Sequence, residues 1–93
     1  MNSEPRMDSL LEELEGAANK LAVKVTYESL AETVVGGGLC KVKGSYRVII
    51  EKRGTVGEKV ITLAKALASL DTEGVFLSPP ARDLVARYQG HVA

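Results

Sequence analysis

The spacing of hydrophobic residues predicts a helix and then a strand in the first third of the chain. Between residues 7 and 21, apolar side chains recur at positions 7, 10, 11, 14, 17, 18 and 21, a helical stripe that covers about a third of the circumference. Pro5 suits the opening turn of this helix. Val23, Val25 and Tyr27 then alternate with polar residues, which is typical of a strand of about six residues with one apolar face. The following residues, 28–35, are ambiguous, because Thr33-Val34-Val35 can extend a strand before the glycines begin.

Two β-branched runs on either side of Lys43-Gly44-Ser45 predict a β-hairpin whose register depends on its loop. A two-residue loop would pair Val42 with Ser45, and the apolar faces of the two strands would then disagree. A three-residue loop gives one continuous apolar face and is therefore expected. The expected pairs are Val42 with Tyr46, Cys40 with Val48, and Gly38 with Ile50.

On its opposite face, the expected register places Leu39 opposite Ile49 and Lys41 opposite Arg47. Like charges directly opposed cost about 0.2–1 kcal/mol, so either solvent screens them or an anion lies between them. Leu39 and Ile49 would form an apolar centre with a charged rim, as protein interfaces do. The alternative is that the last helix covers this pair.

The remaining pattern predicts two more helices. One runs from about residue 55 to 70, and its apolar stripe is wide enough for deep burial. A short extended piece follows at residues 75–77, and Ser78 is expected to cap a last helix over residues 81–89 with proline in its first turn. The predicted fold class is α+β, in two layers, with a three-stranded antiparallel sheet, helices packed on one face, and the order α-β-β-β-α-α. Residues 1–93 would form a single domain with frayed ends at 1–6 and 90–93.

Composition narrows the class of protein. The chain has 93 residues, of which 45% are hydrophobic and 26% charged, as in an ordinary globular domain. Neither a signal peptide nor a membrane-spanning run is expected, and the single cysteine fits a reducing compartment, so the cytoplasm is the expected location.

The balanced total charge hides an uneven distribution. Residues 1–35 carry a net charge of −4 and residues 36–59 carry +4. Two interpretations follow. The two segments can lie side by side and neutralise each other, or the basic segment can bind an acidic partner, a nucleic acid or the acidic segment of a second copy.

The sequence contains few residues able to carry catalysis. Gly36-Gly37-Gly38 precedes a strand and lacks the spacing of a phosphate-binding loop. Cys40 is expected to be a small core residue, and His91 lies in the C-terminal tail. No spacing of metal ligands is present, so no cofactor and no metal are expected. Arg53-Gly54-Thr55 precedes a helix near Lys52 and Lys59, where an anion could bind.

Part of the chain resembles the zincin-like metallopeptidases that accompany phage-type repressors. The resemblance covers residues 47–70, and its specific part is Thr62-Leu63-Ala64 with Leu67. Lys65, Ala66 and Ser69 stand where that family has its zinc histidines and catalytic glutamate, so the resemblance implies an inactive domain without metal. The alternative is a chance match between helices rich in leucine and alanine.

The predicted element order is also similar to the double-stranded-RNA-binding domain. That family has Gly-x-x-Gly before its last helix, as Gly54-Thr55-Val56-Gly57 stands here, and grips phosphates with lysines at the helix start. Only Lys59, Lys52 and Arg53 could do so in this chain, and Glu58 intrudes. The resemblance implies weak, salt-sensitive nucleic-acid binding.

The sequence therefore favours a small non-catalytic module that binds a protein partner or a second copy of itself. Nucleic-acid binding through the basic hairpin and an inactive metallopeptidase-like domain are the alternatives, and no membrane association is expected. The candidate binding residues are Leu39, Lys41, Lys43, Arg47, Ile49, Lys52, Arg53 and Lys59.

Overall fold

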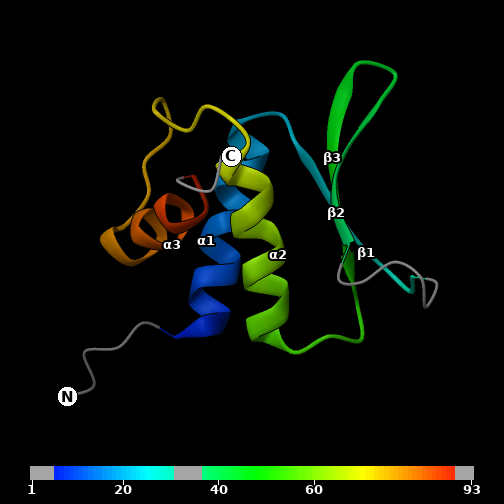
Figure 1. Cartoon of the computed structure of the whole chain (residues 1–93), viewed down its shortest axis with the longest axis horizontal. Helices are drawn as coiled ribbons and strands as arrows, with labels where there is room; N and C mark the ends of the chain where they lie inside the picture. Colours follow the sequence, from blue (N-terminus) through cyan, green and yellow to red (C-terminus); the bar gives the residue numbers. More distant parts are fainter. Residues whose placement is uncertain (1–5, 31–36, 90–93) are drawn as a thin grey trace.

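The structure is a computed structural model that describes residues 6–30 and 37–89. Its elements, in chain order, are α1 (Met7–Lys20), β1 (Lys24–Glu28), β2 (Gly37–Val42), β3 (Ser45–Glu51), α2 (Val56–Ala68) and α3 (Pro79–Gln89). The α+β class and the order α-β-β-β-α-α are confirmed (Figure 1). The predictions made for Pro5, Thr33-Val34-Val35 and residues 90–93 lie outside the described residues.

The core lies between the helices and one face of the sheet. Buried apolar side chains of α1, among them Leu10 and Leu14, meet the buried stripe of α2, which includes Leu63 and Leu67. These helices lie side by side, α1 contacting β1 and α2 contacting β2 and β3 (Figure 1). The last helix, α3, packs on α1 and α2, away from the sheet.

The end of α1 turns the chain sharply toward the sheet. Ala22 has a positive φ of 61°, and the backbone N–H of Val23 donates to the carbonyl of Ala18 at 2.8 Å. This is the Schellman arrangement, which usually has glycine at the position of Ala22. Val23 is buried and anchors the turn, so β1 begins directly afterwards at Lys24.

The sheet is mixed, so the expectation of an all-antiparallel sheet is wrong for one pair of strands. Its order is β1-β3-β2, with β2 antiparallel and β1 parallel to β3. The most apolar strand, β3, lies at the centre of the sheet, the position that is most completely covered by neighbouring elements. Its side chains Val48 and Ile50 are fully buried. Hydrophobic alternation predicts which side chains face the core but not strand direction, which explains the error.

The expected three-residue hairpin loop is also wrong. Val42 pairs with Ser45 across a two-residue turn, Lys43-Gly44, in which φ is 52° and 83°. Positive φ at both turn residues matches the right-handed twist of the strands, and this turn geometry outweighs the continuous apolar face that favoured the longer loop. The observed pairs include Leu39 with Val48, Cys40 with Arg47 and Lys41 with Tyr46.

The register gives the sheet two different faces. The inner face, toward α1 and α2, carries Val25, Tyr27, Leu39, Val48 and Ile50. The outer face carries Lys24, Thr26, Glu28, Gly38, Cys40, Val42, Arg47 and Ile49. Each helix of the described chain that touches the sheet, α1 or α2, does so on its inner side.

A carboxylate of α1 fixes the start of α3. Glu13 accepts hydrogen bonds from the backbone N–H of Ser78 at 2.5 Å and from its hydroxyl at 2.7 Å. Pro79 and Pro80 offer no N–H in this first turn, so an acid from another helix meets the positive end of α3 instead. The expected extended piece at residues 75–77 is not a strand, although Val75 and Leu77 are buried.

Candidate functional site: the hairpin end, the β2 edge and the α2 groove

The expected outward pair of Leu39 and Ile49 does not form. Leu39 lies on the inner face, packed against the core, whereas Ile49 lies half-buried on the outer face opposite Gly38. The two-residue turn causes this, because it shifts the register by one position. Cys40, expected in the core, is a half-buried free thiol on the outer face.

Lys41 and Arg47 are not opposed either. Lys41 pairs with Tyr46, and its Nζ lies 5.3 Å from the centre of that ring, a cation–π distance. Arg47 stands between Cys40 of β2 and Lys24 of β1. The predicted repulsion across the hairpin is therefore absent from this pair, and Arg47 has Lys24 beside it instead.

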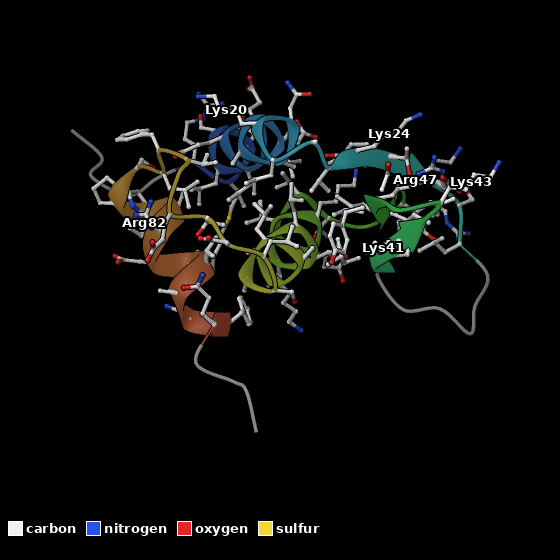
Figure 2. The ribbon with its side chains drawn as sticks, turned by 90° about the horizontal axis from the view of Figure 1, so that it is seen from above. Lys20, Lys24, Lys41, Lys43, Arg47 and Arg82 are labelled. Carbon is white, nitrogen blue, oxygen red and sulfur yellow. The ribbon has the colours of Figure 1, made fainter. Side chains whose placement is uncertain are left out.

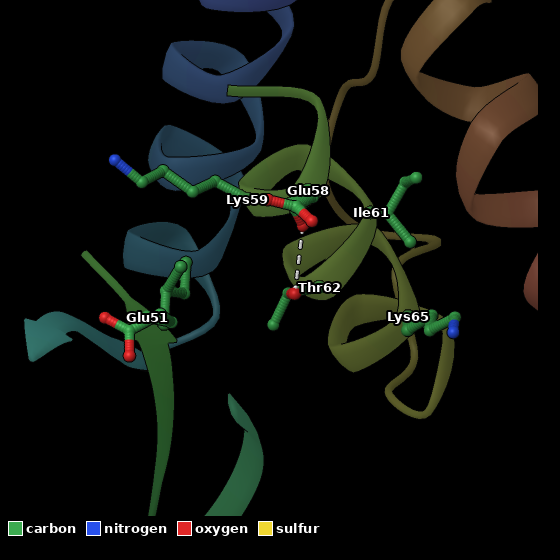
Figure 3. A pocket seen from close by; sticks show the side chains of 7 residues that line it. Glu51, Glu58, Lys59, Ile61, Thr62 and Lys65 are labelled. Atoms are coloured by element: carbon green, nitrogen blue, oxygen red, sulfur yellow. Dashed lines mark hydrogen bonds between the residues drawn. The ribbon is translucent and has the colours of Figure 1, made fainter. Parts of the chain in front are cut away.

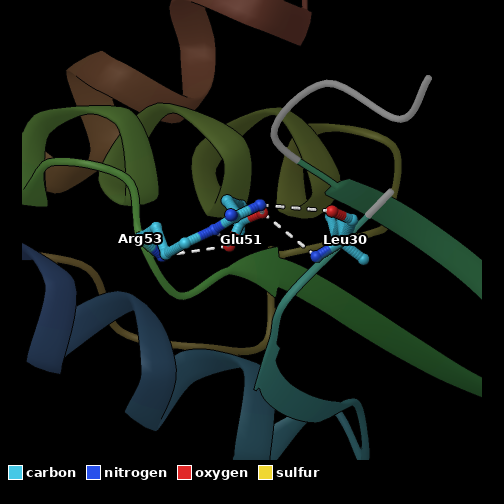
Figure 4. Close-up of polar contacts among 3 residues, drawn as sticks. All are labelled: Leu30, Glu51 and Arg53. Atoms are coloured by element: carbon cyan, nitrogen blue, oxygen red, sulfur yellow. Dashed lines mark hydrogen bonds and ion pairs between the residues drawn. The ribbon is translucent and has the colours of Figure 1, made fainter. Parts of the chain in front are cut away.

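Arg53, one of the basic residues after β3, is engaged within the fold. Arg53 forms an ion pair with Glu51, with Nη2 at 2.9 Å from Oε1, and donates to the carbonyl of Leu30 at 3.3 Å (Figure 4). Glu51 also accepts from the backbone N–H groups of Leu30 and Arg53, each at 3.0 Å. The guanidinium of Arg53, and then these N–H groups, lower the pKa of Glu51 from 4.5 to about 2.

The start of α2, expected to be able to bind an anion, is filled by the chain itself. The hydroxyl of Thr55 accepts from the N–H of Glu58 at 3.1 Å, and Glu58 accepts from the N–H of Thr55 at 2.8 Å. This capping box places a carboxylate at the positive end of the helix. Lys59 instead lies over the ring of Tyr27, at 5.6 Å. Lys52 stays exposed in the bend.

Four basic side chains gather at the end of the sheet that carries the hairpin turn (Figure 2). This basic end consists of Lys24, Lys41, Lys43 and Arg47. None of them forms an ion pair with a carboxylate of the described residues, where the ion pairs are Arg6–Asp8 and Arg53–Glu51. Lys24 was missed by sequence reasoning, because only the parallel pairing of β1 with β3 brings it beside Arg47.

A hollow of about 400 Å³ lies at this basic end. We call it the notch; it is lined by Ala22, Lys24, Val42, Lys43, Ser45, Tyr46 and Arg47. It forms because β1 begins at Lys24, opposite Arg47. On that side of β3, Ser45 and Tyr46 therefore have no residue of β1 beside them. The notch therefore combines three cations with Tyr46, a residue that is 39% exposed.

The acidic residues of α1, unlike the basic end, are mostly used inside the fold. Glu13 holds Ser78, Asp8 pairs with Arg6 at 2.7 Å, and Glu15 accepts a hydrogen bond from the hydroxyl of Tyr27. Partial removal from water, and then this carboxylate, raise the pKa of Tyr27 above its ordinary value.

A groove lies along α2, and Figure 3 shows the residues that line its larger part. It joins two hollows of about 280 and 220 Å³ that share Ile61, Thr62 and Lys65 as lining. We call it the α2 groove. One hollow reaches Ile50 and Glu51 at the end of β3, and the other reaches Gly37-Gly38-Leu39 at the start of β2. Ile61 is 39% exposed and lies where the hollows meet.

The strand β2 lies at the edge of the sheet, beside this groove. Because the residues that flank a two-residue turn form a hydrogen-bonded pair, Val42, Cys40 and Gly38 direct their N–H and C=O groups toward β3. Leu39 and Lys41 direct theirs away from the sheet. These outward groups can form a ladder with one more strand.

The resemblances to zincin-like metallopeptidases and to RNA-binding domains both involve residues of α2. Thr62 and Lys65 line the α2 groove along its whole length, and Ala66 and Ser69 line its half beside β2. Among residues 6–30 and 37–89, no group of three or more His, Cys, Asp and Glu side chains is placed to hold a metal ion. The likeness to zincin-like metallopeptidases and that to RNA-binding domains both stay predictions.

Comparisons with known proteins add no relative to this picture. The chain matches no protein-family model, no curated protein and no solved structure. In the part of the chain that the structure describes, none of the helices has both the length and the apolar character needed to cross a membrane.

Proposed function

We propose that this protein is a small non-catalytic module of the cytoplasm that binds an extended segment of a partner protein along β2. The observation that carries the proposal is the outward-facing backbone of Leu39 and Lys41 beside the α2 groove. An added strand would continue the ladder, and side chains of that strand on the inner side would enter the groove.

The side chains around the groove favour a segment that carries acidic residues. Lys65 lines both hollows, with its Nζ 5.5 Å from the centre of the Tyr88 ring, and Lys41 lies on β2 next to the groove. Neither lysine forms an ion pair with a carboxylate of the described chain. Both acids nearby are already bound, since Glu51 is held by Arg53 and Glu58 by the N–H of Thr55. Ile61 supplies an apolar contact between these charges.

A library of random short peptides displayed on phage tests this proposal. We expect enrichment of acidic peptides with alternating apolar residues. Two versions of a synthetic peptide are compared, one N-methylated at its odd-numbered residues and one at its even-numbered residues, which are the two phases. Methylation should abolish binding in one phase and be tolerated in the other, because alternate amides of an added strand face β2. Equal effects in both phases, or a selection that enriches no peptide, would contradict strand addition.

Ile61→Glu and Val56→Glu form a matched pair for the groove. Both side chains are exposed on α2, at 39% and 40%, and only Ile61 lines the groove. We expect Ile61→Glu to weaken peptide binding by about tenfold or more, which corresponds to about 1.4 kcal/mol, and Val56→Glu to leave it within about twofold. Equal losses would place the peptide elsewhere.

Sedimentation distinguishes a foreign segment from a second copy. The proposal predicts a monomer when no peptide is present. A dimer that Ile61→Glu dissociates would instead identify a second copy as the occupant of the β2 edge.

A further inference from the structure

The geometry points to a second binding site at the notch, which takes the backbone and one base of a single-stranded nucleic acid. The site is separate from the α2 groove, and its central residues Lys24, Ser45 and Tyr46 were not among the candidates taken from the sequence. Its parts come from three segments that the fold brings together: the start of β1, the hairpin turn and the start of β3.

The first step of the argument is charge. Lys24, Lys43 and Arg47 line one hollow, and no carboxylate of the described residues forms an ion pair with any of them (Figure 2). By contrast, Arg53 at the other end of β3 is paired with Glu51. Placing like charges side by side costs free energy, and Lys24 and Arg47 are direct partners across β1 and β3. A bound polyanion removes this cost and gains from the release of counterions.

The second step is the aromatic ring in the same hollow. Tyr46 lines the notch and is 39% exposed, and Nζ of Lys41 lies 5.3 Å from the centre of its ring. Tyr46 projects to the other side of the sheet from Arg47, so a base on the ring and a phosphate at Lys24 and Arg47 would lie on either side of the edge of β3. Cations that follow a phosphate backbone, combined with an exposed aromatic ring on which a base can stack, are the usual components of sites for single strands. An acidic protein segment would use the cations and would need an aromatic side chain to stack on Tyr46, whereas every nucleotide carries a flat base, so the ring favours nucleic acid.

The third step is shape. Ser45 and Tyr46 extend past the point where β1 begins, so the notch is open along the hairpin and about 400 Å³ in volume. This volume admits one base with its sugar and phosphate. The small number of cations predicts modest affinity with a strong dependence on salt.

The test uses a fluorescein-labelled oligothymidylate of about twelve nucleotides, with fluorescence anisotropy measured over a range of salt concentrations. Lys24→Gln combined with Lys43→Gly should weaken binding by about tenfold or more and reduce the slope of log K against log salt by about 1.4, at about 0.7 per lost contact. Glycine at position 43 keeps the positive φ of the turn, so the hairpin should remain folded.

Lys52→Gln is the matched control. It removes one positive charge at the other end of β3, where the resemblance to RNA-binding domains placed the contacts. We expect Lys52→Gln and Ile61→Glu to leave oligothymidylate binding within about twofold, and Tyr46→Leu to weaken it by about fivefold or more through lost stacking. If Lys52→Gln weakens binding as much as the double variant, the notch is not the site.

Two further ligands show which class of polyanion the notch binds. A duplex of the same length should bind more weakly than the single strand. Polyglutamate should bind more weakly too, and its binding should not respond to Tyr46→Leu. Polyglutamate binding equal to that of oligothymidylate would overturn the proposal in favour of an acidic protein, and tighter binding of the duplex would overturn it in favour of a double-stranded ligand.

Discussion

The two ends of β3 differ in how the fold treats its charged and apolar groups. At the end that leads into α2, Ile50 is 1% exposed, and Glu51 is held by Arg53 and by the N–H of Leu30. At the hairpin end, Tyr46 is 39% exposed, and Arg47 lies beside another cation, Lys24. We call the end of β3 at Ile50 and Glu51 the satisfied end, because its charged groups have partners, and it contributes stability. We call the end at Tyr46 and Arg47 the open end, and it is free to contribute binding.

This comparison also separates what can be predicted from the sequence from what cannot. Helices α1 and α2 follow their apolar stripes to within one or two residues, because helical periodicity is local and their burial is deep. The capping box at Thr55 is equally local, whereas the hydroxyl of Ser78, expected to cap the last helix, donates to Glu13 of α1 instead.

The candidate site was less predictable because it depends on register and strand direction. A shift of one residue moved Leu39 inward and Cys40 outward, and the parallel pairing brought Lys24 to Arg47. The alternation of apolar and polar residues predicts neither property. The turn at Lys43-Gly44, with positive φ at both residues, sets the register of β2, and the central position of β3 sets the pairing of β1. The signal that was available is Gly44 between two β-branched runs, because glycine readily adopts the positive φ that the second residue of a two-residue loop requires.

The largest expected difference between the two ends concerns side-chain truncation. Ile50→Ala removes a buried side chain and should lower the free energy of unfolding by about 2–5 kcal/mol, because it leaves a cavity under α2. Val42→Ala, at a side chain that is 43% exposed near the turn, should change it by less than about 0.5 kcal/mol. Urea unfolding curves measure both. Similar losses would show that the hairpin end is as tightly packed as the other.

Gly37→Ala sharpens the comparison on β2. Gly37 has a φ of 103°, and a Cβ there would lie 1.8 Å from the carbonyl oxygen of Ile49. We expect a loss of about 1–3 kcal/mol from the backbone shift that this contact forces. Gly38→Ala is the control, because nothing lies within 4 Å of its Cβ position. Thermal unfolding of the two variants should rank them in this order, and the reverse order would be inconsistent with the register of β2.

Acid should weaken the satisfied end of β3. The pKa of Glu51 is lowered from 4.5 to about 2 in the folded chain, so this carboxylate stabilises the fold above pH 4.5, and its contribution is lost as the pH falls from 4.5 toward 2. Unfolding of Glu51→Gln should therefore depend less on pH in that interval than unfolding of the parent chain. An acid dependence of Glu51→Gln as steep as that of the parent chain would contradict this role of the carboxylate.

The smallest expected effect is a gain in stability. Ala22 adopts a φ of 61° in the turn that leads to Lys24, and glycine adopts this conformation without the cost that a Cβ imposes. Ala22→Gly should raise the free energy of unfolding by up to about 1 kcal/mol, as measured by the midpoint of urea unfolding. A loss of stability would show that the turn does not have this conformation.

Residue-resolved amide hydrogen exchange tests whether the edge of β2 is uncovered. In the protein without ligand, the account predicts slow exchange at Val48, Ile50 and Cys40, and fast exchange at Leu39 and Lys41, whose N–H groups point away from β3. That alternation along β2 is the result expected of an uncovered edge strand beside a groove. Exchange at Leu39 and Lys41 as slow as at Cys40 would show that the edge is already covered, and would contradict the proposed binding of a partner segment there.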